Sequence, residues 1–305
     1  MSRPHYRLGI NHHLLYPASL DSASAHGDSL AEALALPGFE VTDCYVPSSG
    51  EEAQTRAIAR IAASGREPIY NCPLMLGPDW GPHHPDVVVR ERTRDEAKRH
   101  IDRAKSIGAR KMVVASGDDP GPERREEEMA LMIAYMIDLC AYAGAGLCLM
   151  IEPFDRSIGR NLLIGPTVEA VAVVEAVRSA GCENIGLLVD MGHIPLMGES
   201  FRHAVATAGR HIRHVHLGSC VMRDSRDPLY GDMHPPWGYP GGENDVAEAA
   251  EFLRCLIDAG YFEVEGEESP TLTLEMRPYP GMTERSSAEL FIRKLEQAWQ
   301  EAERL

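Results

Sequence analysis

The chain has 305 residues, of which 44% are hydrophobic and 25% are charged, and its formal net charge is −16. This composition is typical of a soluble globular protein, and the negative charge disfavours nucleic acid and anionic membranes as partners because both carry negative charge. The N-terminus lacks an apolar signal region, no apolar segment reaches membrane-spanning length, and the seven cysteines are scattered without a Cys-x-x-Cys pair. We therefore expect a cytoplasmic protein without a disulfide framework or a thiolate zinc site.

Short apolar segments alternate with amphipathic segments along the whole chain. The apolar segments predict strands at residues 7–13, 39–46, 67–72, 111–117, 147–153, 186–193, 212–217 and 272–278. The amphipathic segments predict helices at residues 28–36, 51–63, 93–107, 124–142, 166–179, 201–208, 245–259 and 286–304. This alternation predicts an α/β protein in which residues 1–305 form a single (β/α)8 TIM barrel, with a long loop at about residues 218–244 on its active face.

Carboxylate or imidazole side chains occur near the ends of the last four predicted strands. These residues are Glu152, Asp190, His216 and Glu275. A single glutamate at a strand end is more often an exposed residue or a salt-bridge partner. Four such residues on consecutive strands indicate a site, because the strand ends of a barrel converge where this fold places its chemistry. Three carboxylates and one imidazole suit one divalent metal ion, Mn²⁺ in the first place, with Mg²⁺, Co²⁺ and Zn²⁺ as alternatives.

This ligand set predicts a reaction at a carbonyl group. A bound metal would polarise the carbonyl of a keto-sugar and acidify the adjacent C–H, and Glu152 or Glu275 would remove the proton to give an enediolate. We therefore predict a metal-dependent isomerase or epimerase that acts on a small carbohydrate. The same proton removal can expel a β-substituent, so a lyase is the first alternative, and a sugar-binding barrel without catalysis is another. No Gly-rich phosphate loop is evident, which favours a non-phosphorylated substrate.

The motifs around these residues also resemble a known family. They are Ile-Glu-Pro at 151–153, Val-Asp-Met-Gly-His at 189–193, His-Val-His-Leu at 214–217 and Leu-Glu-Met at 274–276. They resemble the xylose isomerase-like sugar isomerase/epimerase superfamily, which includes keto-sugar 3-epimerases, hydroxypyruvate isomerases, inosose dehydratases and isomerases, endonuclease IV-type DNA repair enzymes and C-glycoside deglycosidase subunits. The resemblance implies that the four residues bind the metal and that the two glutamates transfer protons. The resemblance rests on ordered motifs in the second half of the chain and on the alternation of predicted strands and helices in the first half.

Four further residues are candidate substrate contacts. The resemblance implies this role for His193 and Arg223, although Arg223 lies one residue beyond the position expected from the epimerases. Trp237, in the long loop, could stack on a sugar ring or an aromatic aglycone, or could belong to an ordered lid or subunit contact. His12, near the end of the first predicted strand, either faces the pocket or is a hydrogen-bonded structural histidine.

The partner expectations follow from the same reading. The DNA repair branch of the family needs additional His and Asp metal ligands and a basic face, which the net charge of −16 disfavours. We expect a homo-oligomer, with a small partner subunit if the protein is of the deglycosidase type.

Overall fold

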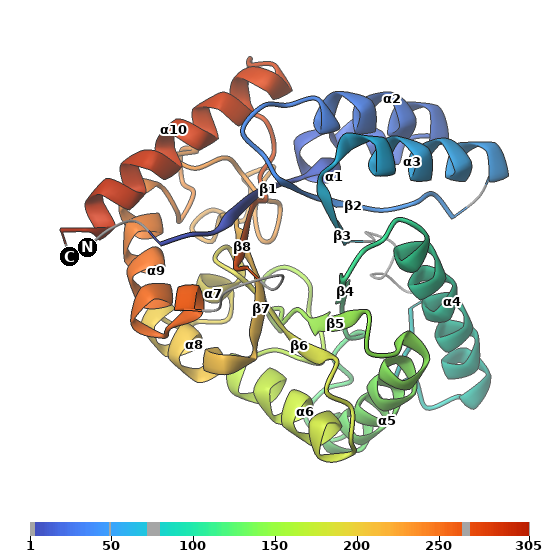
Figure 1. Ribbon diagram of the computed structural model, residues 1–305. Coiled ribbons are helices and arrows are strands. Elements are labelled where there is room, and N and C mark those ends of the chain that lie inside the picture. Colours follow the sequence, from blue (N-terminus) through green and yellow to red (C-terminus); the bar gives the residue numbers. More distant parts are fainter. Residues whose placement is uncertain (1–3, 49, 72–79, 264–268, 305) are drawn as a thin grey trace.

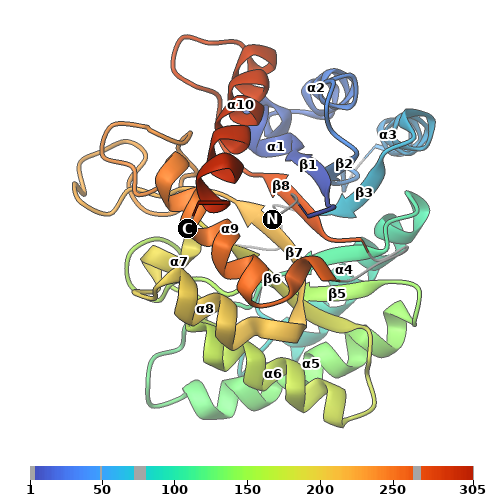
Figure 2. The same ribbon diagram turned by 60° about the vertical axis from the view of Figure 1, so that its left-hand side comes forward.

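The computed structural model describes residues 4–48, 50–71, 80–263 and 269–304. In this part of the chain, eight parallel strands follow one another around a closed barrel, and the last strand pairs with the first (Figure 1). The helices form an outer ring around the strands, and the turned view shows α8, α9 and α10 in succession along one side (Figure 2). The predicted (β/α)8 barrel is therefore confirmed.

The strands are short, and polar residues follow several of them directly. The strands are β1 (Arg7–Asn11), β2 (Val41–Cys44), β3 (Glu67–Tyr70), β4 (Lys111–Val114), β5 (Cys148–Ile151), β6 (Ile185–Asp190), β7 (Ile212–Leu217) and β8 (Thr271–Leu274). The helices are α1 (His12–Leu15), α2 (Ala23–Leu34), α3 (Glu51–Ser64), α4 (Val87–Ser106), α5 (Arg125–Ala143), α6 (Thr167–Ser179), α7 (His193–Leu196), α8 (Phe201–Ala208), α9 (Val246–Asp258) and α10 (Glu284–Ala302). Among the described residues, no helix has both the length and the apolar character needed to cross a membrane.

Three helices begin earlier than predicted because a capping residue lies upstream. The predicted start of α10 at Ser286 is wrong, since the side chain of Thr283 already accepts a hydrogen bond from the Ser286 backbone N–H at 3.2 Å. Helix α2 begins after the cap residue Ser22 rather than near Asp28, and α4 begins after the cap residue Asp86. An N-cap oxygen satisfies a backbone donor that the first helical turn leaves unpaired, so its position sets the start of the helix.

The interior of the barrel combines an apolar part with a polar part. Side chains from β2 to β6 form a buried apolar cluster that consists of Val41, Ile69, Val113, Met150 and Leu188. Asp43 of β2 hydrogen-bonds to His214 of β7 and to Thr273 of β8. Because β2 is not paired with β7 or β8, these bonds cross the interior. The polar part of the barrel interior therefore lies inside the barrel next to the C-terminal ends of β7 and β8.

Candidate metal centre

The structure brings the four strand-end residues together. Asp190 is the last residue of β6, His216 lies within β7, and Glu152 and Glu275 directly follow β5 and β8. One ligand atom from each side chain lies within 4.8 Å of the others, and all four residues are buried. The parallel barrel causes this convergence, because all strands end at the same rim.

Several atoms of this cluster lack the partner that a buried polar atom requires. Asp190 Oδ2, His216 Nδ1 and Glu275 Oε2 make no hydrogen bond to the described residues. The last two atoms lie 2.5 Å apart, and their relative orientation is not that of a hydrogen bond. Glu152 Oε1 lies 3.9 Å from His216 Nδ1. Buried polar atoms without partners are costly, so this donor set fits a cation that all of them contact.

The charges of the cluster favour the same conclusion. Burial raises the pKa of Glu152 to about 8, and the nearby carboxylates of Glu275 and Asp190 add to the rise. Burial, followed by the charge of Glu275, likewise raises the pKa of Asp190 to about 6. Carboxylates that repel each other in a buried site bind protons unless a positive charge is supplied. A divalent cation supplies that charge, and oxygen-rich ligands of this kind suit Mn²⁺, Mg²⁺, Co²⁺ or Zn²⁺.

Asp43 contacts the imidazole of His216 from within the barrel interior. Its Oδ2 lies 2.9 Å from His216 Nε2 and 3.1 Å from His214 Nε2, and its Oδ1 accepts a hydrogen bond from the Thr273 hydroxyl at 2.6 Å. Although burial opposes it, the two histidines hold the pKa of Asp43 well below its usual range. A carboxylate on Nε2 keeps the proton on that nitrogen and leaves Nδ1 free to bind a metal. Sequence reasoning missed Asp43, and the only signal was a charged residue in the middle of a buried strand.

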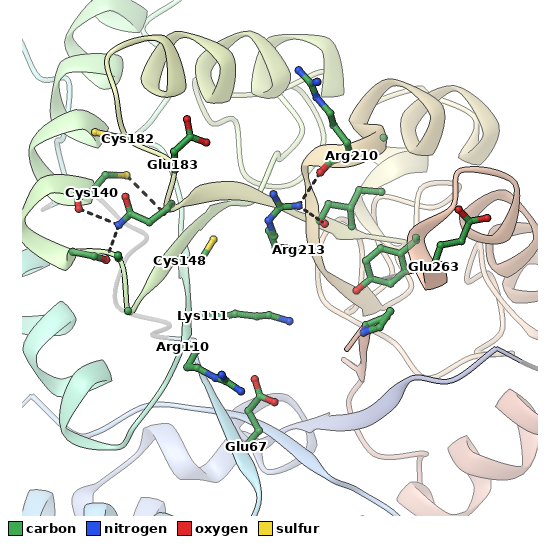
Figure 3. A pocket seen from close by; sticks show the side chains of 18 of the residues that line it. Glu67, Arg110, Lys111, Cys140, Cys148, Cys182, Glu183, Arg210, Arg213 and Glu263 are labelled. Carbon is green, nitrogen blue, oxygen red and sulfur yellow. Dashed lines mark hydrogen bonds between the residues drawn. The ribbon is translucent and has the colours of Figure 1, made fainter. Parts of the chain in front are cut away.

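The polar contacts continue along the barrel interior to its other end. Thr271 Oγ1 lies 2.7 Å from His214 Nδ1 and accepts a hydrogen bond from Lys111 Nζ at 2.9 Å. Lys111 lines a cavity of about 1010 Å³ (Figure 3). This cavity lies where β4, β5 and β7 begin, and Cys148 and Ile212 also line it. None of the groups of three potential metal ligands found among the described residues lies in this cavity. Its size alone therefore does not make it the site of chemistry.

A cavity of about 440 Å³ lies over the strand-end cluster. Glu152, Glu275 and His193 form part of its wall. The remaining lining residues are His13, Leu14, Pro17, Leu20, Asn71, Val113, Ala115, Phe154, Arg160, Asp232, Met233, His234 and Arg277. The cavity is large enough for a molecule the size of a small carbohydrate, and both glutamates belong to its wall.

A second group of ligands shares Asp190 with the first. Asp190, His193 and His234 each offer one atom within 4.8 Å of the others. Asp232 Oδ1 lies 3.1 Å from His193 Nε2 and 2.8 Å from His234 Nε2. Burial lowers the pKa of His234, but Asp232 and Glu275 outweigh this effect and raise it to about 9. Sequence reasoning missed Asp232 and His234, which the Asp-x-His pattern within the long loop could have indicated.

The structure brings only one of the four predicted substrate contacts to the cavity. His193 lines it, and its contact with a substrate stays a prediction. Arg223 points outward with 73% of its side chain exposed and pairs with a nearby glutamate. Trp237 is fully buried and its indole N–H donates to a backbone carbonyl. His12 is also buried, 2.9 Å from a serine hydroxyl, and the neighbouring His13 lines the cavity instead.

Comparisons with known proteins agree with the barrel fold. The sequence model of a family described as xylose isomerase-like TIM barrel matches residues 29–295. An L-ribulose 3-epimerase structure has 20% identity and a TM-score of 0.71, with 98% of this chain and 97% of that chain covered. The IOLI protein with a binding zinc atom has 15% identity and a TM-score of 0.66, with 98% of each chain covered.

A third solved structure has the same fold. It is an AP endonuclease, family 2, from Brucella melitensis, with 17% identity, a TM-score of 0.65, and 95% of this chain and 99% of that chain covered. Comparison with curated protein sequences gives no match. At these identities the solved structures show the shared fold and do not show a shared reaction.

Proposed function

The chain belongs to the xylose isomerase-like TIM barrel family, and on this premise we propose that it is a divalent-metal-dependent isomerase or epimerase of a keto-sugar or related hydroxy-ketone. The observation that carries the proposal is the buried cluster in which three potential ligand atoms, from Asp190, His216 and Glu275, make no hydrogen bond to the described residues. The cavity over this cluster exposes two glutamates to a bound molecule.

The two glutamates are the proposed proton carriers. Glu152, Asp190, His216 and Glu275 would hold a divalent cation, with Mn²⁺ proposed first, which would polarise a substrate carbonyl and make the neighbouring C–H more acidic. Glu275 is held in place because its Oε1 accepts a hydrogen bond from Asn11 Nδ2 at 2.7 Å. Glu152 lies on the other side of His216, after β5 rather than β8. Bases delivered from two non-adjacent strands can act on opposite faces of one carbon, as epimerisation requires.

We assign His193 and His234 a supporting role in the proton transfer. Both line the cavity, and both contact the carboxylate of Asp232. An imidazole held by a carboxylate can donate a hydrogen bond to a substrate oxygen or protonate a leaving group. The ability to protonate a leaving group supports the lyase as the second candidate, because an elimination needs a proton donor beside the departing group.

The proposal is tested by deuterium exchange. The Mn²⁺-loaded protein is incubated in D₂O with a panel of keto-sugars, beside its Glu152→Gln and Glu275→Gln variants. We expect C–H exchange in the wild type and a loss of roughly 10²-fold or more in both variants. Glu51→Gln, on the exposed start of α3, is the matched control and should exchange at the wild-type rate.

The products and the metal content decide among the alternatives. An epimer or an isomer supports the proposal, whereas an unsaturated product assigns the lyase. Bound metal without exchange on any keto-sugar would indicate a sugar-binding barrel. A protein that takes up no divalent metal even after reconstitution refutes the metal centre itself. A metal count near two per chain would place a second ion at the group formed by Asp190, His193 and His234.

A further inference from the structure

Two guanidinium groups line the cavity beside the strand-end cluster. Arg160 belongs to the loop after β5, and Arg277 lies two residues after Glu275. Both belong to the wall of the 440 Å³ cavity. Neither residue is a candidate metal ligand, and the proton transfers proposed above do not use them. Two cations at one small cavity therefore suggest a separate task in substrate recognition.

Arg160 is held firmly by two buried aspartates. The carboxylate of Asp155 accepts hydrogen bonds from the backbone N–H groups of residues 157–160, which fixes the loop. The Arg160 side chain donates from Nε to Asp232 Oδ2 at 2.7 Å and from Nη2 to the Asp232 carbonyl at 3.2 Å. Its Nη1 makes no hydrogen bond to the described residues, and 38% of the side chain is exposed. One face of this guanidinium therefore remains available to a ligand.

Arg277 is held by backbone groups and not by a carboxylate. Its backbone N–H donates to the His234 carbonyl at 2.9 Å, and its Nε donates to the Met233 carbonyl at 2.8 Å. Neither Nη nitrogen makes a hydrogen bond, and the side chain forms no ion pair, within the described parts of the chain. Two guanidinium groups with unpaired N–H donors therefore lie in the wall of one cavity, and the oxygens of an anion can accept hydrogen bonds from both.

The two arginines differ in their charge partners. The guanidinium of Arg160 pairs with the carboxylate of Asp232 at 2.7 Å. Arg277 then adds a positive charge that no described carboxylate pairs with. We propose that Arg160 and Arg277 bind an anionic group of the substrate, either a carboxylate or a phosphate, while its carbonyl end occupies the metal centre.

This inference rests on the proposed function, because it assigns the far end of the same substrate. The planar N–H groups of arginine match the oxygens of both anion types, so a carboxylate and a phosphate would be bound in the same way. The absence of a Gly-rich phosphate loop does not oppose it, since these donors are side chains and not backbone amides. The net charge of −16 slows the approach of an anion from a distance but is screened by salt, whereas the contacts inside the cavity are local.

The experiment compares ketoses that differ only at the end of the chain remote from the carbonyl. The dissociation constants of D-fructose, D-fructuronate and D-fructose 6-phosphate are measured by calorimetry on the Mn²⁺-loaded protein. We expect at least one anionic ketose to bind roughly tenfold or more tightly than fructose. In Arg277→Gln the preference should fall to within about twofold. Arg226→Gln, which removes the same charge from an exposed side chain outside the cavity wall, should keep it.

The outcomes separate this inference from the proposed function. A preference for fructuronate alone assigns a carboxylate, and a preference for the 6-phosphate alone assigns a phosphate. Equal binding or no binding of the three ketoses to the wild type overturns the anion site, as does a preference that survives in Arg277→Gln. Deuterium exchange on neutral ketoses without any anion preference overturns the anion site alone. An anion preference that depends on Arg277, without exchange on any ketose, retains the anion site and refutes the proposed catalysis.

Discussion

Replacement of Asp43 by asparagine is expected to weaken metal binding about 10- to 100-fold, although Asp43 is not itself a candidate ligand. In the wild type, Oδ2 of Asp43 contacts the Nε2 atoms of both His214 and His216. The asparagine can turn its carbonyl oxygen toward the two histidines and keep these contacts, so the change removes the negative charge and leaves the shape nearly intact. The loss of that charge makes the Nδ1 of His216 a weaker ligand.

The expected weakening corresponds to about 1.4 to 2.8 kcal/mol in binding free energy. It is measured by titration of Mn²⁺ into the metal-free protein at fixed pH, with urea unfolding of both proteins as a check on the fold. Thr42→Val is the matched control, because Thr42 is the buried neighbour of Asp43 on β2 and contacts Arg66 instead of the metal centre. Binding of Mn²⁺ to Asp43→Asn within about twofold of the wild type would show that Asp43 does not tune the site.

Two further predictions concern Asp190 and Glu152. A Cβ atom at Gly218 would lie 2.6 Å from Asp190 Oδ1, so Gly218→Ala should displace this ligand and lower metal affinity at least about tenfold. In the control variant Gly146→Ala the added atom meets nothing within 4 Å, so metal affinity should not change. Equal metal affinities of the two variants would contradict the geometry. In the metal-free fold the pKa of Glu152 rises from an ordinary 4.5 to about 8. The protonated Glu152 therefore stabilises the fold below about pH 4.5, and this stabilisation is lost as the pH rises to about 8. A bound metal reverses this loss, so the increase in Tm on adding Mn²⁺ should grow between about pH 5 and about pH 8. An increase in Tm that is independent of pH would show that Glu152 does not release a proton on metal binding.

The barrel and the four strand-end residues could be predicted from the sequence because their signals are local. A short apolar strand followed by a turn is recognisable without its neighbours, and the fold itself then brings strand ends together. No further information was needed to group Glu152, Asp190, His216 and Glu275, since each lies at or within one residue of the C-terminal end of its own strand.

The choice between two adjacent histidines depended on where the first strand stops. Alternation along a strand would place His12 and His13 on opposite sides. β1 ends at Asn11, however, and α1 begins at His12, so successive side chains rotate by about 100° instead. This rotation buries His12 beside α2 and leaves His13 in the cavity wall.

The remaining parts of the site depended on contacts between segments that are far apart in the chain. Asp43 meets His216 across the barrel interior, and Arg160 meets Asp232 between two different loops. Periodicity describes which side of an element a residue occupies, but it contains no information about which distant element packs there. The sequence alone therefore determined the fold and the strand-end cluster. Only the tertiary structure decided which side chains contact that cluster and which charges surround the cavity over it, because burial and pairing arise from packing and not from local pattern.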